Sequence, residues 1–210
     1  MKRYGLVVAL VLAAAASLLA QSPAGWKMRV DRSMNASDPD PAGAIKFVTM
    51  GSGFHATNPQ AAVYWNPANT ASGNFSLKGT FNLVNAGPHQ EYYGLIFGGS
   101  GLEGAAQSYI YFMVEHEGSW LIKSRNGSST AAIASSGGPS DVVKKADVGG
   151  TSSNTLEVHV LADRIEFLVN GKVVSTPPKT ALAIKTDGIY GIRVNHMLEV
   201  QIDDFKMTKM

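Results

Sequence analysis

Apolar and polar side chains alternate along most of the chain, with a period of two residues. The alternation is clearest in residues 74–84, 156–160 and 165–169. Such a pattern predicts β-strands that bury one face and expose the other. The last run is followed by Asn170-Gly171, and because both residues tolerate a positive φ, they predict a type I′ turn that closes a hairpin.

Further strands are predicted where short apolar runs lie between turn-forming residues, and no apolar stripe with helical spacing competes with them. Their ranges are 26–30, 45–50, 61–65, 92–98, 108–116, 119–125, 188–195 and 198–207. Three stretches poor in apolar residues are predicted surface loops: 33–43, 66–73 and 126–153. Many short strands without βαβ units predict an all-β, two-sheet antiparallel sandwich or jelly roll. The residues predicted to point inward are Phe75, Phe81, Val158, Val160, Ile165, Phe167, Ile192 and Val200.

Residues 1–20 have the composition of a helical secretory signal peptide. They open with cationic side chains, continue with an apolar run free of charge, and end at Ala20. The apolar run is shorter than the ~20 residues that a membrane-spanning helix needs. We expect cleavage after Ala20, with residues 14–16 as an alternative site. Residues 21–210 then form a single mature domain, secreted to a bacterial periplasm or to the exterior.

Loss of the leader changes the charge of the chain. It removes Lys2 and Arg3 from the 18 Lys and Arg, which leaves 16 against 16 Asp and Glu. No basic run remains that could neutralise a series of phosphates, so nucleic acid is not an expected partner. The sequence contains no cysteine, which excludes disulfides, thiolate chemistry and Cys-ligated metals. The domain must therefore be held together by its core.

The hairpin predicted over residues 109–125 carries the most informative side chains. If Glu117-Gly118 is a two-residue turn, Glu115 faces Trp120 on the face opposite to the aliphatic residues. That face mixes aromatic rings with a carboxylate, and sugars suit such a surface because their C–H faces stack on rings while their hydroxyls bond to polar groups. Polar residues of 188–195 extend the predicted ligand-binding set, which is Tyr109, Tyr111, Glu115, Trp120, Arg193 and Asn195. The alternative is that these side chains only cover a sheet edge and meet solvent.

Acidic residues offer two routes to catalysis. Glu115 and Glu117 resemble the paired carboxylates with which retaining glycosidases cleave sugars, although Glu117 is expected in a turn. Glu91, with a histidine nearby, is the other candidate. The histidines lack the spacing of zinc ligands. We therefore assign no catalytic residue from the sequence.

A calcium site is predicted from aspartates near the two ends of the chain. Asp203 and Asp204 lie close to the C-terminus, while Asp38 and Asp40 lie in an early loop. Carboxylate oxygens are the ligands that calcium prefers, so Asp203 and Asp204 are the predicted metal ligands. Surface aspartates without a metal are the alternative, and no other cofactor is expected.

Short motifs rich in glycine and aromatic residues occur in a fixed order: YGLIFGG at 93–99, YIYF at 109–112, GSWLI at 118–122, NTLEV at 154–158, FLVNGKV at 167–173 and GIYGI at 188–192. Together they resemble the laminin-G-like part of the concanavalin A-like lectin/glucanase superfamily, over residues 45–208. A bacterial secreted branch near the 3-keto-disaccharide hydrolase domain has a similar closing pattern. The resemblance implies a concanavalin A-like sandwich. That superfamily includes lectins, glycosidases and adhesion domains, but the clustered acids of the glucanase strand are missing here.

The sequence thus predicts a secreted carbohydrate-binding domain that is not catalytic. One alternative is a sugar-active hydrolase, either a glycosidase or an enzyme like the 3-keto-disaccharide hydrolases. Another is a structural or adhesion domain that binds protein. Carbohydrate is the expected partner, a protein partner stays open, and no membrane association is expected once the leader is cleaved.

Overall fold

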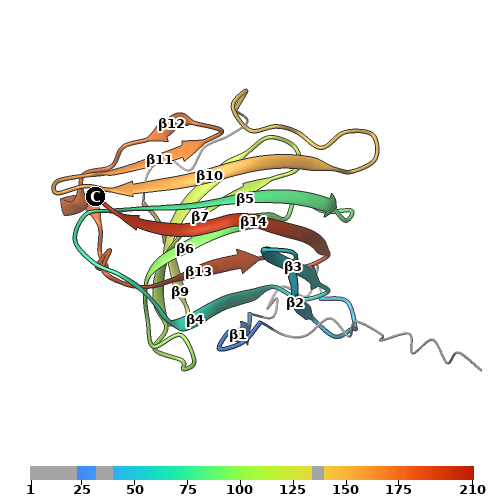
Figure 1. Ribbon diagram of the computed structural model, residues 1–210, viewed down its shortest axis with the longest axis horizontal. Helices are drawn as coiled ribbons and strands as arrows, with labels where there is room; N and C mark the ends of the chain where they lie inside the picture. The colour runs from blue at the N-terminus through green and yellow to red at the C-terminus, as the bar shows by residue number, and fades with distance from the viewer. Residues whose placement is uncertain (1–22, 32–39, 134–139) are drawn as a thin grey trace, which may run out of the picture.

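The computed structural model describes residues 23–31, 40–133 and 140–210, which form two antiparallel sheets packed face to face (Figure 1). The all-β sandwich predicted from the period-two alternation is confirmed. Within the described residues the one other regular element is a short 3₁₀ helix, η1 (Lys179–Ala181). The predicted signal peptide and its cleavage site lie outside the described residues.

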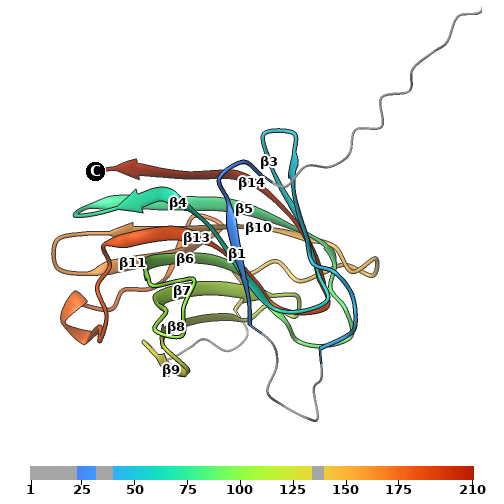
Figure 2. The same ribbon diagram turned by 90° about the horizontal axis from the view of Figure 1, so that it is seen from below.

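The first sheet, called the β7 sheet, has the strand order β1-β4-β13-β6-β7-β8-β9. Its strands are β1 (Lys27–Val30), β4 (Ala62–Ala71), β6 (Tyr92–Ser100), β7 (Ser108–Glu115), β8 (Trp120–Asn126), β9 (Ser129–Ala132) and β13 (Gly188–Val194). The second, called the β5 sheet, has the order β12-β11-β10-β5-β14-β3-β2. Its strands are β2 (Lys46–Met50), β3 (Gly53–Asn58), β5 (Phe75–Asn85), β10 (Ser152–Val160), β11 (Ile165–Val169), β12 (Lys172–Ser175) and β14 (Leu198–Lys209). Figure 2 shows the two layers from below.

The core lies between the sheets, where alternate residues of both meet. All eight residues predicted to point inward are fully buried, so that part of the prediction is confirmed. Phe167 of β11 shows the contact between layers, because its ring centroid lies 6.1 Å from that of Phe97 and 5.2 Å from that of Phe112. The predicted type I′ turn is also present, with φ of 51° at Asn170 and 78° at Gly171.

The connection between β7 and β8 is one residue longer than predicted. The Glu115 N–H donates to the Ser119 carbonyl at 3.0 Å, so three residues and not two form the loop. Val114 therefore pairs with Trp120, and the predicted pairing of Glu115 with Trp120 is wrong. A shift of one residue turns a side chain to the opposite face of a sheet. Trp120 accordingly packs into the main core, with 8% of its surface exposed.

Strands with weak alternation were missed in the sequence. Residues 66–71, predicted as a loop, belong to β4, which bulges where it pairs with β13. Strand β3 was also missed, and the predicted loop 126–153 contains β9. Gly53 begins β3, and a Cβ there would overlap with the Ile202 carbonyl of β14. The close approach of these two strands explains why glycine stands at this position.

Candidate functional site

Three of the predicted ligand-binding residues come together on the outer face of the β7 sheet. Arg193 Nη1 donates to Tyr109 Oη at 2.8 Å, and Arg193 Cζ lies 5.6 Å from the centroid of the Tyr111 ring. Both rings are buried, Tyr109 completely. Burial raises the pKa of Tyr109 to about 12, so its hydroxyl keeps its proton at neutral pH. The guanidinium thus covers the aromatic platform that the sequence predicted for sugar stacking.

The other predicted residues lie elsewhere. Glu115 is fully buried, and its carboxylate accepts the Glu117 N–H at 2.6 Å and the Ser119 N–H at 2.7 Å. It therefore holds its own turn together and does not share a face with Trp120, which is in the core. Asn195 follows β13, and its backbone N–H donates to the Tyr92 carbonyl at 2.9 Å. The six residues do not form a single site.

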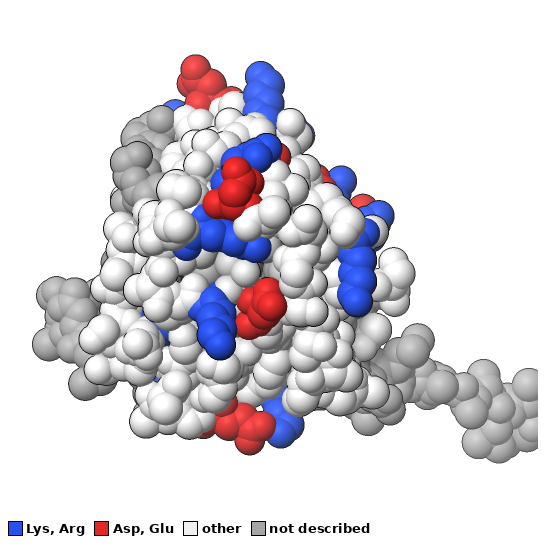
Figure 3. Space-filling view, turned by 90° about the vertical axis from the view of Figure 1, so that its left-hand side faces the viewer, with Lys and Arg blue, Asp and Glu red and all other residues white. Residues whose placement is uncertain are grey.

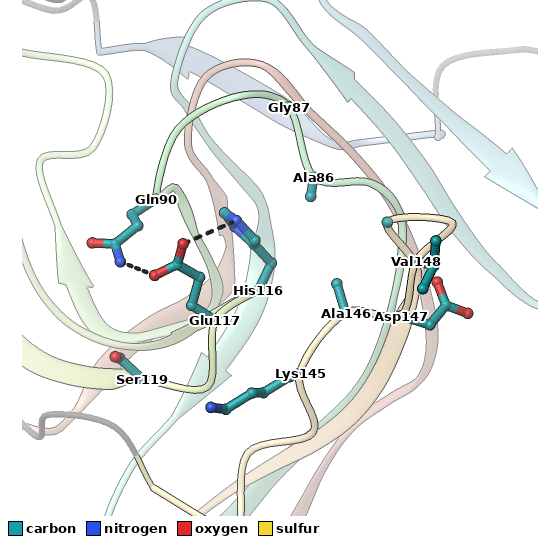
Figure 4. Close-up of a pocket in the computed structure, with 11 residues that line it drawn as sticks. Ala86, Gly87, Gln90, His116, Glu117, Ser119, Lys145, Ala146, Asp147 and Val148 are labelled. Carbon is teal, nitrogen blue, oxygen red and sulfur yellow. Dashed lines mark hydrogen bonds and ion pairs between the residues drawn. The ribbon is translucent and has the colours of Figure 1, made fainter.

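A pocket of about 600 Å³ (Figure 4) is formed by loops that lie at the end of the sandwich opposite to the C-terminus (Figure 1). It is called the loop-end pocket here. Three connections far apart in the sequence enclose it: the one after β5, the β7–β8 turn, and the loop before β10. Its lining residues are Ala86, Gly87, Gln90, His116, Glu117, Ser119, Lys145, Ala146, Asp147, Val148 and Gly150.

Polar groups gather at one side of this pocket. Glu117 stands between two partners in Figure 4: Gln90 Nε2 donates to its Oε2, and His116 Nε2 lies 4.0 Å from its Oε1. The Glu117 side chain remains 56% exposed. The Lys145 stem packs against Gly118, whose φ of 100° also favours glycine. Carboxylate, amide, imidazole and ammonium groups therefore border one open space, and each can bond to a hydroxyl.

The loop before β10 is fixed to the β7–β8 turn by its backbone. The Ser140 N–H donates to the Gly118 carbonyl and the Ala146 N–H to the His116 carbonyl, each at 2.8 Å. Within the loop, Asp147 accepts the Thr151 N–H and the Gly149 N–H at 2.9 Å. These bonds, the one from Thr151 first, lower the pKa of Asp147. The pocket is thus held open by fixed backbone.

A histidine flanked by two carboxylates lies at the same end of the sandwich. His196 follows β13 and is buried, with Nδ1 at 2.8 Å from Asp40 Oδ1 and Nε2 at 2.8 Å from Glu91 Oε1. The His89 ring centroid lies 6.2 Å from that of His196. From the sequence, Glu91 with a nearby histidine is a candidate for catalysis. In the structure the histidine beside Glu91 is His196, which is remote from it in the sequence.

The aspartates predicted to bind calcium occupy β14. Asp203 Oδ2 accepts hydrogen bonds from Asn82 Nδ2 at 2.8 Å and Gln201 Nε2 at 3.0 Å, while Asp204 is exposed. Of the partners expected from the early loop, Asp40 contacts His196 and Asp38 lies outside the described residues. In the part of the chain that the structure describes, no group of three or more His, Asp or Glu is placed to hold a metal ion. The calcium site stays a prediction.

The pocket residues Gln90, His116 and Lys145 were missed in the sequence. His116 and Glu117 were visible in a predicted turn, and Gln90 in a polar stretch beside Tyr92. Lys145 lies in a long predicted loop and carries no local signal. Only the approach of the three connections makes these side chains neighbours.

No protein-family model matches the chain, and no curated protein sequence matches it. Solved structures do match, and they share the two-sheet β-sandwich fold. The carbohydrate-binding module CBM66 from Bacillus subtilis has a TM-score of 0.62 and 11% identity, covering 88% of this chain and 96% of that one. The carbohydrate recognition domain of Emp46p has a TM-score of 0.55, 12% identity and 87% coverage of both chains.

A third neighbour is the exoplasmic/lumenal domain of VIP36 in its Ca²⁺-bound form. It has a TM-score of 0.54 and 10% identity, covering 89% of this chain and 84% of that one. At such identities the similarity establishes the two-sheet β-sandwich fold alone. Among the residues that the structure describes, no helix is long and apolar enough to cross a membrane.

Proposed function

We propose that this chain is a carbohydrate-binding domain and that the sugar binds in the loop-end pocket. The observation that carries the proposal is the arrangement of Glu117, Gln90, His116 and Lys145 around about 600 Å³ of open space. Small-ligand sites typically have volumes of about 300 to 1,000 Å³ and a few convergent polar groups. The sandwich fold, shared with a carbohydrate-binding module and a carbohydrate recognition domain, adds support.

The lining of the pocket suits a neutral sugar. Glu117 and Asp147 contribute negative charge and Lys145 positive charge, so no single sign dominates. Ala86 and Ala146 face the pocket in Figure 4, and Val148 is fully exposed at its rim. These apolar groups can contact the C–H faces of a sugar while the polar groups bond to its hydroxyls.

The pocket favours binding over hydrolysis. A retaining glycosidase needs two carboxyl groups about 5 Å apart that are free to act as nucleophile and acid. Glu115 is used by the backbone of its own turn, and Asp147 by Gly149 and Thr151. Of the carboxylates that border the pocket, Glu117 is thus the one directed at a ligand.

Sugar binding by variants of the pocket tests the proposal. A glycan array first identifies a neutral ligand, and calorimetry then measures its affinity. Glu117→Gln and Lys145→Ala should each weaken binding by about tenfold, the effect of losing ~1.4 kcal/mol. Because both side chains lie at an open pocket, the melting temperature should stay unchanged. Lys172→Ala, on exposed β12, is the matched control. Unaltered affinity in both pocket variants would reject this site.

A second candidate function is a sugar-active hydrolase that uses Glu91. Its support is the pairing of Glu91 with His196, and of His196 with Asp40, at the end of the sandwich that carries the pocket. Such a chain of groups can move a proton. Analysis of products after incubation with the bound glycan separates the two functions. Turnover that is lost in Glu91→Gln supports hydrolysis, whereas binding without turnover supports the first proposal.

Three finer assignments also belong to this proposal. The leader composition supports secretion to a bacterial periplasm or the exterior, and N-terminal sequencing of the exported protein tests it. The ordered motifs support the laminin-G-like branch of the superfamily.

A calcium site at Asp203 and Asp204 is tested by comparing the melting temperature in millimolar calcium with that in a chelator. A bound ion must raise the melting temperature.

A further inference from the structure

Three guanidinium groups converge on one carboxylate at the outer face of the β7 sheet. Asp31, which directly follows β1, forms ion pairs with Arg193 Nη1, with Arg125 Nη1 at 3.5 Å and with Arg29 Nε at 3.6 Å. Within the described parts of the chain, no other carboxylate lies within 4 Å of these guanidiniums. The three arginines, with Asp31, are called the arginine cluster.

The charge in this cluster is unbalanced. Burial opposes ionisation of Asp31, but Arg193, followed by Arg125 and Arg29, outweighs it and holds the pKa of Asp31 below its ordinary value. One negative charge therefore stands among three positive ones. Lys123, which pairs with Tyr111 on the neighbouring strand, adds another cation to this face. On the end of the molecule in Figure 3, by contrast, acidic and basic side chains are interspersed.

Each guanidinium is held in place by the protein and still has donors to spare. Arg29 Nη1 donates to the Gly104 carbonyl, Arg125 Nε to the Gly127 carbonyl, and Arg193 Nη1 to Tyr109. For the remaining Arg193 donors, Nε and Nη2, the described residues provide no partner. The Arg193 side chain is 12% exposed, and Arg125 and Arg29 are 21% and 25% exposed. The guanidiniums of the cluster are thus preorganised and partly exposed.

A buried amide without a partner adjoins the cluster. Gln107 is 1% exposed, and neither Oε1 nor Nε2 has a hydrogen-bond partner among the described residues. The Gln107 carbonyl accepts the N–H of Gly127, the same residue whose carbonyl binds Arg125. An unpaired buried amide costs about 1 to 3 kcal/mol, and a ligand that bonded to it would remove that cost.

We propose that the arginine cluster is a second binding site, distinct from the loop-end pocket, and that it takes the carboxylate of a small acidic ligand such as a uronic acid. Guanidinium forks match a planar carboxylate with two parallel hydrogen bonds. A second anion brings the local charge closer to balance. Because Asp31 and Arg193 are nearly buried, the surface of a folded protein cannot contact them, and the ligand must be a small group. The site goes beyond the proposed function by adding a charged ligand class.

Binding of glucuronate, glucose and inorganic sulfate, measured by calorimetry at constant ionic strength, tests the site. Glucuronate should bind about tenfold more tightly than glucose or more. Arg125→Gln should remove that difference, and Arg125→Lys should remove most of it, because lysine keeps the charge but loses the fork. Lys145→Ala should leave glucuronate binding unchanged. Arg29→Gln, on the edge strand β1, provides a second variant if Arg125→Gln lowers the melting temperature.

Specific outcomes overturn the site. Equal affinity for glucuronate and glucose, or glucuronate binding that survives both arginine variants, rejects it. Binding of sulfate without glucuronate rejects the carboxylate assignment. Loss of glucuronate binding in Lys145→Ala places the ligand in the loop-end pocket instead. If no neutral sugar binds but glucuronate binds through Arg125, the arginine site stands and the proposed function fails, so the two are separable.

Discussion

At the β7 sheet, individual side chains either stabilise the fold or remain available to a ligand. Trp120 and Tyr111 were both predicted to face a sugar, yet one fills the core and the other lies beneath Arg193. Glu115, also predicted to face a sugar, secures its own turn. Each of these three side chains packs or forms hydrogen bonds within the fold and therefore stabilises it. The groups left for ligands are the partly exposed ones, such as Glu117 and Arg125.

Replacement of Trp120 by Ala tests its place in the core. The variant should lose about 3 to 5 kcal/mol of unfolding free energy, through lost burial and a residual cavity. Urea denaturation measures the loss, with Phe167→Ala, at a fully buried position of the same core, as a comparison of the same expected size. Lys123→Ala, on the opposite face of β8, should change the free energy of unfolding by less than about 0.5 kcal/mol. An unchanged denaturation midpoint in Trp120→Ala would contradict the observed register.

Ionisation of Asp31 should make the stability of the folded state fall at acidic pH. The pKa of Asp31 in the fold lies below its ordinary value of 3.8, so the ionised form stabilises the folded state above that pH. This contribution is lost as the pH falls through the lowered pKa of the folded state. Melting temperatures between pH 7 and pH 2 should therefore drop at the acid end. The Asp31→Asn variant should have a lower melting temperature than the parent at neutral pH, and its melting temperature should fall less between pH 7 and pH 2. If the variant and the parent had the same pH profile, Asp31 would not be the group responsible.

At the scale of elements, the close packing of β3 on β14 limits what position 53 accepts. Gly53→Ala would place a Cβ on the Ile202 carbonyl and force the strands apart. The β-ladder between them should weaken, which predicts a lower melting temperature and faster hydrogen exchange in β3. Gly104→Ala is the control, because its nearest neighbour to a built Cβ lies 3.9 Å away. Equal melting of the two variants would argue against the strand packing.

The β7–β8 turn links stability to the pocket. Glu115→Ala would leave the Glu117 and Ser119 N–H groups without their acceptor, at a cost of about 1 to 3 kcal/mol. Since Glu117 and Ser119 line the pocket, the affinity for a neutral sugar should fall as well. Denaturation and calorimetry on the same sample check both effects. Glu103→Ala, on an exposed loop, should change neither, and a loss of stability with full sugar affinity would separate the turn from the site.

At the scale of the whole molecule, the two proposed sites differ in charge and lie apart. The loop-end pocket has both signs of charge, whereas the arginine cluster is positive. Salt screens interactions between exposed charges. Glucuronate affinity should therefore fall between 0.05 and 0.5 M salt by about tenfold, while neutral-sugar affinity stays nearly constant. Parallel salt dependence of the two ligands would show that they share one site.

The all-β sandwich, its core and its Asn170-Gly171 hairpin could be predicted from the amino-acid sequence alone. These follow from alternation and turn chemistry, which are local properties of the chain. The face of the sheet that Trp120 occupies could not be predicted, because a turn longer by one residue reverses the face and leaves no mark in the alternation. Tertiary contacts also brought Lys145 to Glu117 and Asp31 to Arg193. Such pairs join segments that are far apart in the sequence and meet only when the strands assemble, so no local pattern could indicate them.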